Sequence, residues 1–359
     1  MSPAQAVAIA SLADYEPLAR ERLDAATWAY FNGGAGDEIT LRANAADWAA
    51  LRLLPRVLQP LDGAHTRVEL LGRRLAHPLL VAPMAWQRLL HPDAETGMAV
   101  AASAQEAGYV LSTQTSTPPE TVARAIAGDA SRGPLWFQLY VQADAGFNRE
   151  LMQRAEQAGF EAFVVTVDAP VHGARDAERR SGFRLPPGLA ALALPAAGAA
   201  SGGAPGIMRH LRGTPTWAGI EELIARARLP VLLKGILHPL DALQAVRVGA
   251  AGLIVSNHGG RTLDTAATTA FALTRIADAV QGERPLLVDG GIRRGTDVLK
   301  ALALGARAVL VGRPAAWGLA VAGPPGAAHV LRLLRDEFEI ALALTGCASP
   351  AQVNRDLIV

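Results

Sequence analysis

The sequence contains a single cysteine, Cys347, among 359 residues. One cysteine cannot form an internal disulfide, and it excludes a metal site built from several cysteines, which is typical of a reducing compartment such as the cytoplasm. An excess of charge is also lacking, because 34 basic and 33 acidic side chains leave a formal net charge of +1. Bulk attraction to nucleic acid or to an anionic membrane is therefore not expected, and any anion site must be local.

Targeting and membrane-spanning signals are scarce as well. The N-terminus has no basic region followed by an apolar core, so we expect no secretory signal. The one long stretch without charge is LPPGLAALALPAAGAASGGAPGIM at residues 185–208, and it contains four prolines. Because proline breaks a spanning helix, we expect a surface loop there, with a membrane-contacting segment as the alternative.

Short apolar runs recur along the chain, and each is bounded by turn residues and followed by a segment of helical character. There are eight, at residues 79–86, 109–113, 135–141, 162–168, 230–236, 252–258, 285–291 and 308–314. Such alternation predicts an α/β fold with a parallel sheet covered on both faces, and a closed (β/α)8 TIM barrel is the simplest architecture with this count. The alternative is a doubly wound open sheet, but no glycine-rich fingerprint follows residues 79–86.

The chain is expected to form one domain, residues 1–359, with two additions to the barrel of residues 79–345. Residues 1–78 precede the first strand and are predicted to pack as an N-terminal extension of helices and a short hairpin. The connection at residues 169–216 is far longer than an ordinary barrel loop. Loops of this length are most often functional or disordered, so we predict a mobile lid.

Polar residues stand at the ends of nearly all the predicted strands. In a barrel the chemistry gathers at the carboxyl ends of the strands, so polar residues there carry functional weight. A single histidine or lysine would be weak evidence, but seven strands contribute to the same end. The residues are Ser112, Gln114, Gln138, Tyr140, Thr166, Asp168, Lys234, Ser256, His258, Asp289 and Arg313.

The last two strands add features of an anion site. VDGGIRRGTDV, at residues 288–298, supplies two glycines, Arg293 and a predicted helix start near residue 295, and VGRP repeats glycine and arginine after the eighth strand. Backbone amides, a helix N-terminus and arginine together favour a phosphate. A sugar-phosphate substrate and a phosphate-bearing cofactor both fit this pattern, so it predicts the anion and not the molecule.

Two longer motifs are far more specific than a single glycine pattern. They are SNHGGRTLD at residues 256–264 and DGGIRRGTDVLKALALGA at residues 289–306. With them the chain resembles the FMN-dependent 2-hydroxy-acid oxidase and dehydrogenase family. The similarity runs from YFNGGAGDE near residue 30 to RDEFEIALALTGC near residue 340. The resemblance implies a TIM barrel, FMN as the cofactor and assembly as a homotetramer, and we predict no metal site.

The resemblance implies a place for each part of FMN. A lysine by the N1 and O2 side of the flavin stabilises the negative charge of the reduced ring, and Lys234 matches it. The phosphate is expected at Arg293 and Arg313 with the backbone near Gly291 and Gly312, and the ribityl chain at Asp289. The ring is expected against Pro83, Met84 and Ala85, with hydrogen bonds from Ser112, Gln138, Thr166 and Ser256.

The resemblance also implies how a 2-hydroxy acid is held. Arg175 and Arg261 match two arginines that clamp the substrate carboxylate, and Tyr30 and Tyr140 match tyrosines that add hydrogen bonds. His258 matches the catalytic base, and Asp168 matches the carboxylate that stabilises its imidazolium. Proton removal from the hydroxyl with hydride transfer, and proton removal from Cα to form a carbanion, both remain open. The other histidines are expected to be structural or solvated, except that His172, in the same loop as Arg175, could lie at the entrance of the site.

The substrate side chain and the electron acceptor are less constrained. Short-chain oxidases of the family often have an aromatic residue where this chain has Gln114, and Trp86 is expected to supply an aromatic wall instead. We therefore predict a larger aliphatic or aromatic (S)-2-hydroxy acid such as mandelate, with lactate as the nearest competitor. O2 is the expected acceptor, giving hydrogen peroxide. The alternatives are a dehydrogenase that passes electrons to quinone or cytochrome, a monooxygenase, and a barrel that binds FMN or a sugar phosphate without redox chemistry.

Overall fold

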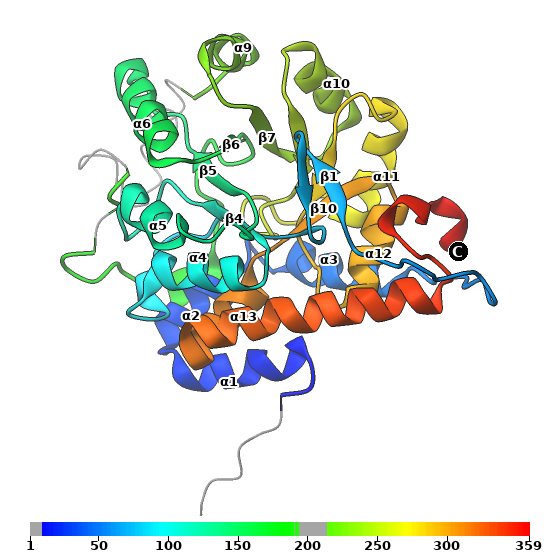
Figure 1. The fold of residues 1–359 in the computed structure, drawn as a ribbon. Coiled ribbons are helices and arrows are strands. Elements are labelled where there is room, and N and C mark those ends of the chain that lie inside the picture. Colours follow the sequence, from blue (N-terminus) through cyan, green and yellow to red (C-terminus); the bar gives the residue numbers. More distant parts are fainter. Residues whose placement is uncertain (1–8, 190, 194–213) are drawn as a thin grey trace, which may run out of the picture.

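Eight parallel strands close into a barrel in a computed structural model that describes residues 9–189, 191–193 and 214–359 (Figure 1). The order around the barrel is β10-β3-β4-β5-β6-β7-β8-β9, so the strands follow one another in sequence and the last closes on the first. The predicted TIM barrel is confirmed. The strands are β3 (Leu79–Val81), β4 (Gly108–Leu111), β5 (Leu135–Leu139), β6 (Ala162–Thr166), β7 (Val231–Ile236), β8 (Gly252–Val255), β9 (Leu286–Val288) and β10 (Ala306–Val311).

Most of the strands are shorter at their carboxyl ends than the apolar runs suggested. The run at residues 79–86 is a strand only to Val81, and the run at 252–258 only to Val255. Trp86 and His258 have positive φ angles of 55° and 57°, which no regular strand accommodates. The polar residues that follow these strands therefore lie in loops at one end of the barrel.

Helices follow the strands, and some of them begin at a side chain that caps their first turn. Asp144 caps one of them by accepting hydrogen bonds from the amides of Gly146 and Phe147, and Thr216 caps another through the amide of Gly219. The helices of the barrel layer are η2 (Gln87–Leu89), α4 (Ala94–Ala104), α5 (Pro119–Ile126), α6 (Ala145–Ala158), α7 (Asp176–Arg180), α9 (Trp217–Arg226), α10 (Pro239–Arg247), α11 (Thr269–Val280), α12 (Gly295–Ala303) and α13 (Arg313–Leu344).

The longest of these helices, α13, crosses the outside of the barrel and packs against α1, α4 and α12 (Figure 1). Non-helical angles at Ala322 and Gly323 break it just before Pro324 and Pro325. The chain ends with η4 (Pro350–Gln352) and η5 (Arg355–Leu357), and Ile358 forms an antiparallel bridge with Leu53. The C-terminal residues thus lie beside the chain that leads into the barrel.

The residues before the barrel form helices and one hairpin. α1 packs on α13, α2 on α7, and α3 on α11 and α12, so these helices reach both the outer layer and the strand ends. Hairpin residues Val68, Leu70 and Leu75 pack with the barrel interior. The elements are η1 (Leu12–Asp14), α1 (Tyr15–Arg22), α2 (Ala25–Asn32), α3 (Ile39–Ala50), β1 (Val68–Leu70) and β2 (Arg73–Leu75).

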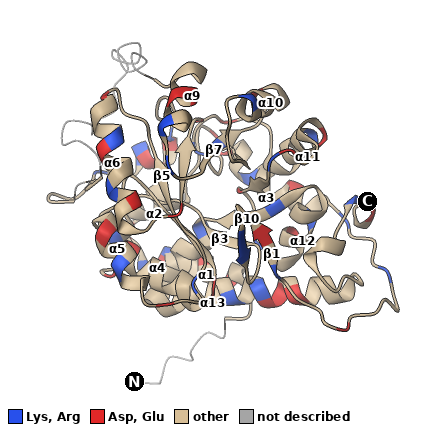
Figure 2. Cartoon of the chain, turned by 45° about the horizontal axis from the view of Figure 1, so that its top comes forward, with Lys and Arg blue, Asp and Glu red and all other residues tan. Residues whose placement is uncertain are grey.

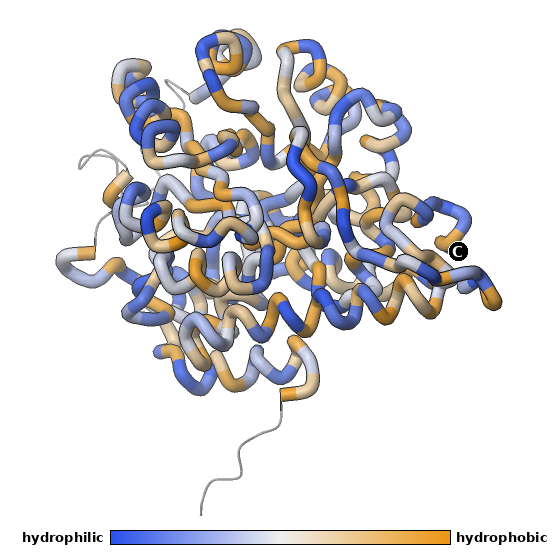
Figure 3. The backbone as a smooth tube through the Cα atoms, viewed as in Figure 1, coloured by the Kyte–Doolittle hydropathy of each residue, from blue (hydrophilic) through white to orange (hydrophobic). Residues whose placement is uncertain are grey.

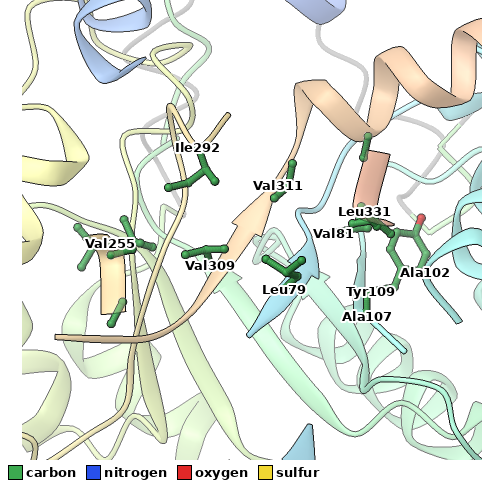
Figure 4. Close-up of a cluster of buried hydrophobic side chains, with 14 of the residues drawn as sticks. Leu79, Val81, Ala102, Ala107, Tyr109, Val255, Ile292, Val309, Val311 and Leu331 are labelled. Carbon is green, nitrogen blue, oxygen red and sulfur yellow. The ribbon is translucent and has the colours of Figure 1, made fainter. Parts of the chain in front are cut away.

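Two hydrophobic clusters divide the core according to strand alternation. Successive strand residues point to opposite faces of a sheet, so Leu79 and Val81 pack outward against helices while Leu80 points into the barrel. Figure 4 shows the outward set, where Val81 and Tyr109 lie beside Ala102 and Leu331 of the helical layer. In Figure 3 the hydrophobic colour concentrates along the strands, whereas the outer helices alternate between apolar and polar positions.

Lys and Arg residues alternate with Asp and Glu residues along the outer helices, as the blue and red segments of Figure 2 show. Among the helices that the structure describes, none is long and apolar enough to cross a lipid bilayer. The lid predicted for residues 169–216 includes residue 190 and residues 194–213, which lie outside the described residues, so the lid stays a prediction.

Candidate active site

A cavity of about 1760 Å³ opens at the carboxyl ends of the strands. Pockets for small molecules usually measure roughly 300–1,000 Å³, so this one has room for two ligands together. Every residue predicted for the cofactor or the substrate lines it except Gln138 and Ser256, and of the predicted catalytic residues only Asp168 does not. The barrel therefore brings together side chains from both halves of the sequence.

The SNHGGR loop after β8 turns through three consecutive residues with positive φ: His258 at 57°, Gly259 at 63° and Gly260 at 73°. A Cβ at Gly260 would lie 2.7 Å from the backbone nitrogen of Leu41, and one at Gly259 would lie 2.8 Å from Nη1 of Arg313. The backbone contact makes glycine necessary at position 260, whereas at position 259 the close atom is the end of an arginine side chain. This turn places the side chains of His258 and Arg261 on the cavity wall.

His258 and Asp168 form a hydrogen-bonded pair behind that wall. The distance from His258 Nδ1 to Asp168 Oδ1 is 2.9 Å, and His258 Nε2 lies 3.4 Å from the hydroxyl of Tyr140. The other oxygen of Asp168, Oδ2, is buried without a hydrogen-bond partner among the described residues. The carboxylate thus fixes the ring orientation and leaves Nε2 toward the cavity.

Burial and charge set the protonation states of this pair. Burial lowers the pKa of His258 more than the neighbouring Asp168 raises it, so the imidazole is neutral at pH 7. Burial raises the pKa of Asp168, but the combined effect of His258 and Lys234 is larger and lowers it, so the carboxyl group is ionised. A neutral imidazole beside a carboxylate is the state required of a general base.

Lys234, Ser256 and Asp289 form a second buried network. Lys234 Nζ lies 3.1 Å from Asp289 Oδ2 and donates to Ser256 Oγ at 2.8 Å, and Ser256 Oγ donates to Asp289 Oδ1 at 2.6 Å. Burial lowers the pKa of Lys234, but Asp289 and Asp168 raise it more, so the ammonium stays charged. A fixed cation therefore lies on the cavity wall.

Two residues predicted to hydrogen-bond a ring edge, Ser256 and Gln138, are absent from the cavity lining. Ser256 Oγ also accepts from the amide of His258 at 3.1 Å, so the protein uses its one proton and both acceptor positions. Gln138 Oε1 accepts from Ser112 Oγ and the amide of Thr113, and its Nε2 donates to Thr166 Oγ1 at 3.0 Å. Neither lines the cavity, and both instead orient residues that do.

Arg261, Arg175 and Tyr30 form a cationic corner of the cavity. Nη1 of Arg261 donates to the carbonyl oxygens of Tyr30 and Gly33, and its guanidinium lies 5.2 Å above the Tyr30 ring. Burial and the nearby Arg175 lower the pKa of Arg261 to about 10, so it remains charged at neutral pH. Nε and Nη2 of Arg261 have no partner among the residues the structure describes, and they are free for an anion.

Arg293 and Arg313 form a second cationic part of the cavity, which adjoins the first because Arg313 and Arg261 both donate to the carbonyl oxygen of Gly33. Arg313 donates to the carbonyl oxygens of Gly259 and Gly33, and its Nε is buried without a partner among the described residues. Burial, together with the charges of Arg261 and Arg293, holds the pKa of Arg313 well below the usual value. In the described part of the chain neither Arg293 nor Arg313 has a carboxylate partner within salt-bridge distance. Because buried cations require a counter-charge, the surroundings of Arg293 and Arg313 suit a phosphate group.

The α12 N-terminus was predicted to contribute to that phosphate site, but three amides at this end of the helix already have partners within the chain. The amides of Arg293 and Arg294 donate to Asp297 Oδ2, each at 3.0 Å, and the amide of Gly295 donates to Glu337 Oε2 at 2.8 Å. Because these carboxylates from the chain itself already satisfy the amides, they are not free for a ligand. The arginine side chains and the glycine turns remain.

Several supporting residues were not predicted. Asn44 of α3 exchanges two amide hydrogen bonds with Asn257, at 2.9 and 2.8 Å, and Trp48 donates to the carbonyl oxygen of Gly290 at 2.9 Å. Phe183 stacks on Tyr30 with ring centroids 4.4 Å apart. The asparagine of SNHGGR was a visible signal, but nothing in the sequence pairs it with a residue 213 positions earlier.

Trp86 and Gln114 form one side of the cavity, where a substrate side chain was expected. The Trp86 amide donates to the carbonyl oxygen of Gln114 at 3.1 Å, which joins the loops after β3 and β4. Tyr30 lines the same cavity, and burial raises its pKa although the nearby Arg261 and Arg175 lower it. Trp86, Tyr30 and Phe183 thus give the cavity three aromatic lining residues.

The chain matches known proteins over nearly its whole length. A family model described as FMN-dependent dehydrogenase matches residues 19–359. An L-lactate oxidase from Roseobacter sp. (strain GAI101) is 47% identical over 354 residues, covering 97% of this chain and 94% of the relative. A 4-hydroxymandelate oxidase from Amycolatopsis orientalis is 44% identical over 353 residues, covering 96% and 97%. A crystal structure of mandelate oxidase with (S)-2-phenylpropionate superposes with a TM-score of 0.89 at 41% identity, covering 98% of both chains.

Proposed function

This chain belongs to the FMN-dependent dehydrogenase family, and from that premise we propose that it oxidises an (S)-2-hydroxy acid to the 2-oxo acid, with O2 as the electron acceptor and hydrogen peroxide as the second product. FMN is the family's cofactor, and when bound it accepts two electrons from the substrate. The observation that carries the proposal is the neutral His258, held by Asp168, facing a cavity with a cationic corner at Arg261.

The buried arginines and glycines give FMN a place that fits the residues present. Arg293 and Arg313 would hold the phosphate together with the turns at Gly291 and Gly312, and Asp289 lies next along the cavity wall. Lys234 lies farther in, where its ammonium would stabilise negative charge on a reduced cofactor. Ser112 and Thr166, oriented by Gln138, add hydroxyl groups to the cavity lining.

The substrate end performs binding and proton transfer. Arg261 offers Nε and Nη2 to the carboxylate, and Arg175 and the hydroxyl groups of Tyr30 and Tyr140 line the same corner. With the carboxylate fixed, His258 Nε2 takes a proton from the substrate, and Asp168 stabilises the resulting imidazolium. Removal of the hydroxyl proton with hydride transfer and removal of the Cα proton both require this arrangement.

We propose a larger aliphatic or aromatic substrate, with lactate as the nearest competitor. Trp86 and Phe183 give the substrate side of the cavity an apolar surface, and Gln114 adds a polar group without aromatic bulk. One relative is an L-lactate oxidase and another a 4-hydroxymandelate oxidase, at 47% and 44% identity, so overall similarity alone does not choose between them.

Reduction of the bound flavin under anaerobic conditions tests both the reaction and the substrate. The purified holoprotein is mixed in a stopped-flow instrument with glycolate, lactate, 2-hydroxyhexanoate and mandelate, and flavin absorbance is followed before and after oxygen is admitted. We expect fast reduction by mandelate or 2-hydroxyhexanoate, slow reduction by glycolate, and rapid reoxidation with formation of peroxide. Failure of every acid to reduce the flavin would overturn the reaction. Slow reoxidation in air would favour a dehydrogenase, and a decarboxylated product would favour a monooxygenase.

We further propose that the protein is a cytoplasmic homotetramer, as the family resemblance and the single cysteine suggest. Light scattering coupled to size-exclusion chromatography measures the mass of the particle directly. A mass of one chain, 37.5 kDa, would contradict the tetramer.

A further inference from the structure

A carboxylate outside the cavity, Glu95, lies in the first turn of α4 and is 0% exposed to solvent. It does not line the cavity, and among the described residues no cation lies within salt-bridge distance of it. A buried carboxylate is strongly unfavourable unless hydrogen bonds compensate for the lost water. The surroundings of Glu95 must therefore provide that compensation.

Among the described residues, this compensation comes from two segments, one after β3 and one after β4. Oε1 accepts hydrogen bonds from the amides of Gln87 and Ser116, at 3.1 and 2.9 Å. Oε2 accepts from the hydroxyl groups of Ser116 and Thr117, at 2.7 and 2.8 Å. Gln87 belongs to the loop after β3, and Ser116 and Thr117 belong to the loop after β4. One carboxylate thus ties two loops together.

These loops carry the two side chains that form the proposed substrate wall. Trp86 directly precedes Gln87, and Gln114 lies two residues before Ser116. The loops are joined again by the Trp86 amide, which donates to the Gln114 carbonyl oxygen, and by the Arg88 amide, which donates to Ser116 Oγ at 3.3 Å. Movement of either loop would therefore move the wall.

Trp86 needs such support because its backbone is in the left-handed region, with φ 55° and ψ 39°. A bulky residue there is strained and keeps that conformation only when its surroundings enforce it. Gln87, the next residue, is held through its amide by Glu95 and through its side chain by the Tyr109 hydroxyl at 3.1 Å. The buried carboxylate is thus one of the contacts that enforce the strained turn.

We propose that Glu95 is a positioning residue that sets substrate size selection by fixing Trp86 and Gln114. This inference rests on the proposed function only for the identity of the substrate. Because Glu95 touches neither the cavity nor the His258–Asp168 pair, its removal should change the binding of the substrate side chain and leave proton transfer intact.

The test compares E95A and E95Q with the unaltered holoprotein over a series of 2-hydroxy acids of increasing side-chain size. For E95A we expect the ratio of kcat/KM between a large and a small acid to change by about tenfold or more, mainly through KM, as is typical when pocket contacts alter. For E95Q we expect near-normal selectivity, since its Oε1 can still accept from both amides and its Nε2 can donate to a hydroxyl group.

A matched control is available at the other end of the barrel. Glu161 precedes β6 and holds Arg132 at 2.6 Å, together with Arg73 and the Leu135 amide, far from the strand ends that carry the cavity. E161A should lower the melting temperature without changing the ratio. An equal loss of kcat/KM for all acids in E95A, or a change in ratio matched by E161A, would overturn the proposal.

Crystal structures of E95A and E95Q provide a readout independent of turnover. We expect Trp86 to leave the left-handed region in E95A and to keep it in E95Q; unchanged positions of residues 86–88 and 114–117 in E95A would overturn the proposal. If E95A does not fold, E95D serves in its place, because its shorter side chain cannot reach both loops. Failure of the unaltered protein to reduce its flavin with any acid would refute the proposed function, whereas the crystal structures would still decide the role of Glu95.

Discussion

Replacing Gly235 with alanine should displace the carboxylate that pairs with the catalytic histidine. Gly235 lies in β7, where the pairing register with β8 shifts between Lys234 and Ile236, and its φ angle is 108°. A Cβ built on it would lie 2.4 Å from Cβ and 2.5 Å from Cγ of Asp168. The missing side chain and the bulge of this strand make room for Asp168 behind His258.

The geometry gives the size of the effect. Carbon atoms pack at about 3.5 Å or more, so Asp168 would have to move by about 1 Å. Its hydrogen bond to His258, now 2.9 Å, would then exceed hydrogen-bonding distance. A misplacement of about 1 Å at a catalytic group costs on the order of 10²-fold in rate. We therefore expect flavin reduction by substrate to slow about 100-fold in G235A.

G249A separates displacement from backbone strain. Gly249 also has a positive φ, 87°, but its nearest neighbour would be Cγ2 of Ile224 at an ordinary 3.6 Å. Alanine in such a conformation costs about 1–2 kcal/mol of stability, so both variants should melt earlier. Only G235A should lose flavin reduction, measured by anaerobic stopped flow from pH 5 to 9 at equal FMN content. Equal reduction rates in the two variants would refute the reasoning.

Other predictions follow from the same structure. H258A should keep FMN yet reduce it at least 10²-fold more slowly, as expected for loss of a general base, and fast reduction would remove His258 from that role. In the unaltered protein, burial holds the His258 pKa below 6.5. As the pH is lowered, the rate of flavin reduction should therefore stay constant down to neutral pH and decrease only in more acidic buffer. A rate that already decreases above pH 7 would contradict this. R261K should weaken substrate binding about 10- to 100-fold while largely sparing the limiting rate, because an ammonium cannot reproduce the guanidinium fork; an unchanged Kd would contradict it. His77 donates to the Gln105 carbonyl oxygen and accepts from the Leu79 amide, and burial lowers its pKa from 6.5 to about 4. Because the unfolded chain binds the proton more readily, the protein should lose about 2 kcal/mol of stability through His77 when the pH falls from 7 to 5. Urea denaturation at the two pH values measures this loss, and the H77Q variant should lose less stability over the same range.

The sequence was sufficient for the barrel and for most of the cavity wall. Burial in a parallel sheet produces continuous apolar runs, which are visible residue by residue, and a polar residue directly after such a run lies at the carboxyl end of its strand. His258, Lys234 and Asp289 were predicted as site residues on that basis, and the structure places each of them on the cavity. The roles of these residues came from the two long motifs, not from periodicity.

The tertiary structure decided where each polar side chain points and which distant residues it contacts. Ser256 and Gln138 stand at strand ends like the others, but their polar groups hydrogen-bond residues at the ends of neighbouring strands. The amide of Gly295 donates to Glu337, which lies 42 residues farther along the chain in another helix. Neither the collision avoided at Gly235 nor the tie at Glu95 has a local sequence signal. Apolar periodicity is a property of each segment and can be read along the chain, whereas hydrogen-bond partners and close approaches exist only after distant segments have packed together.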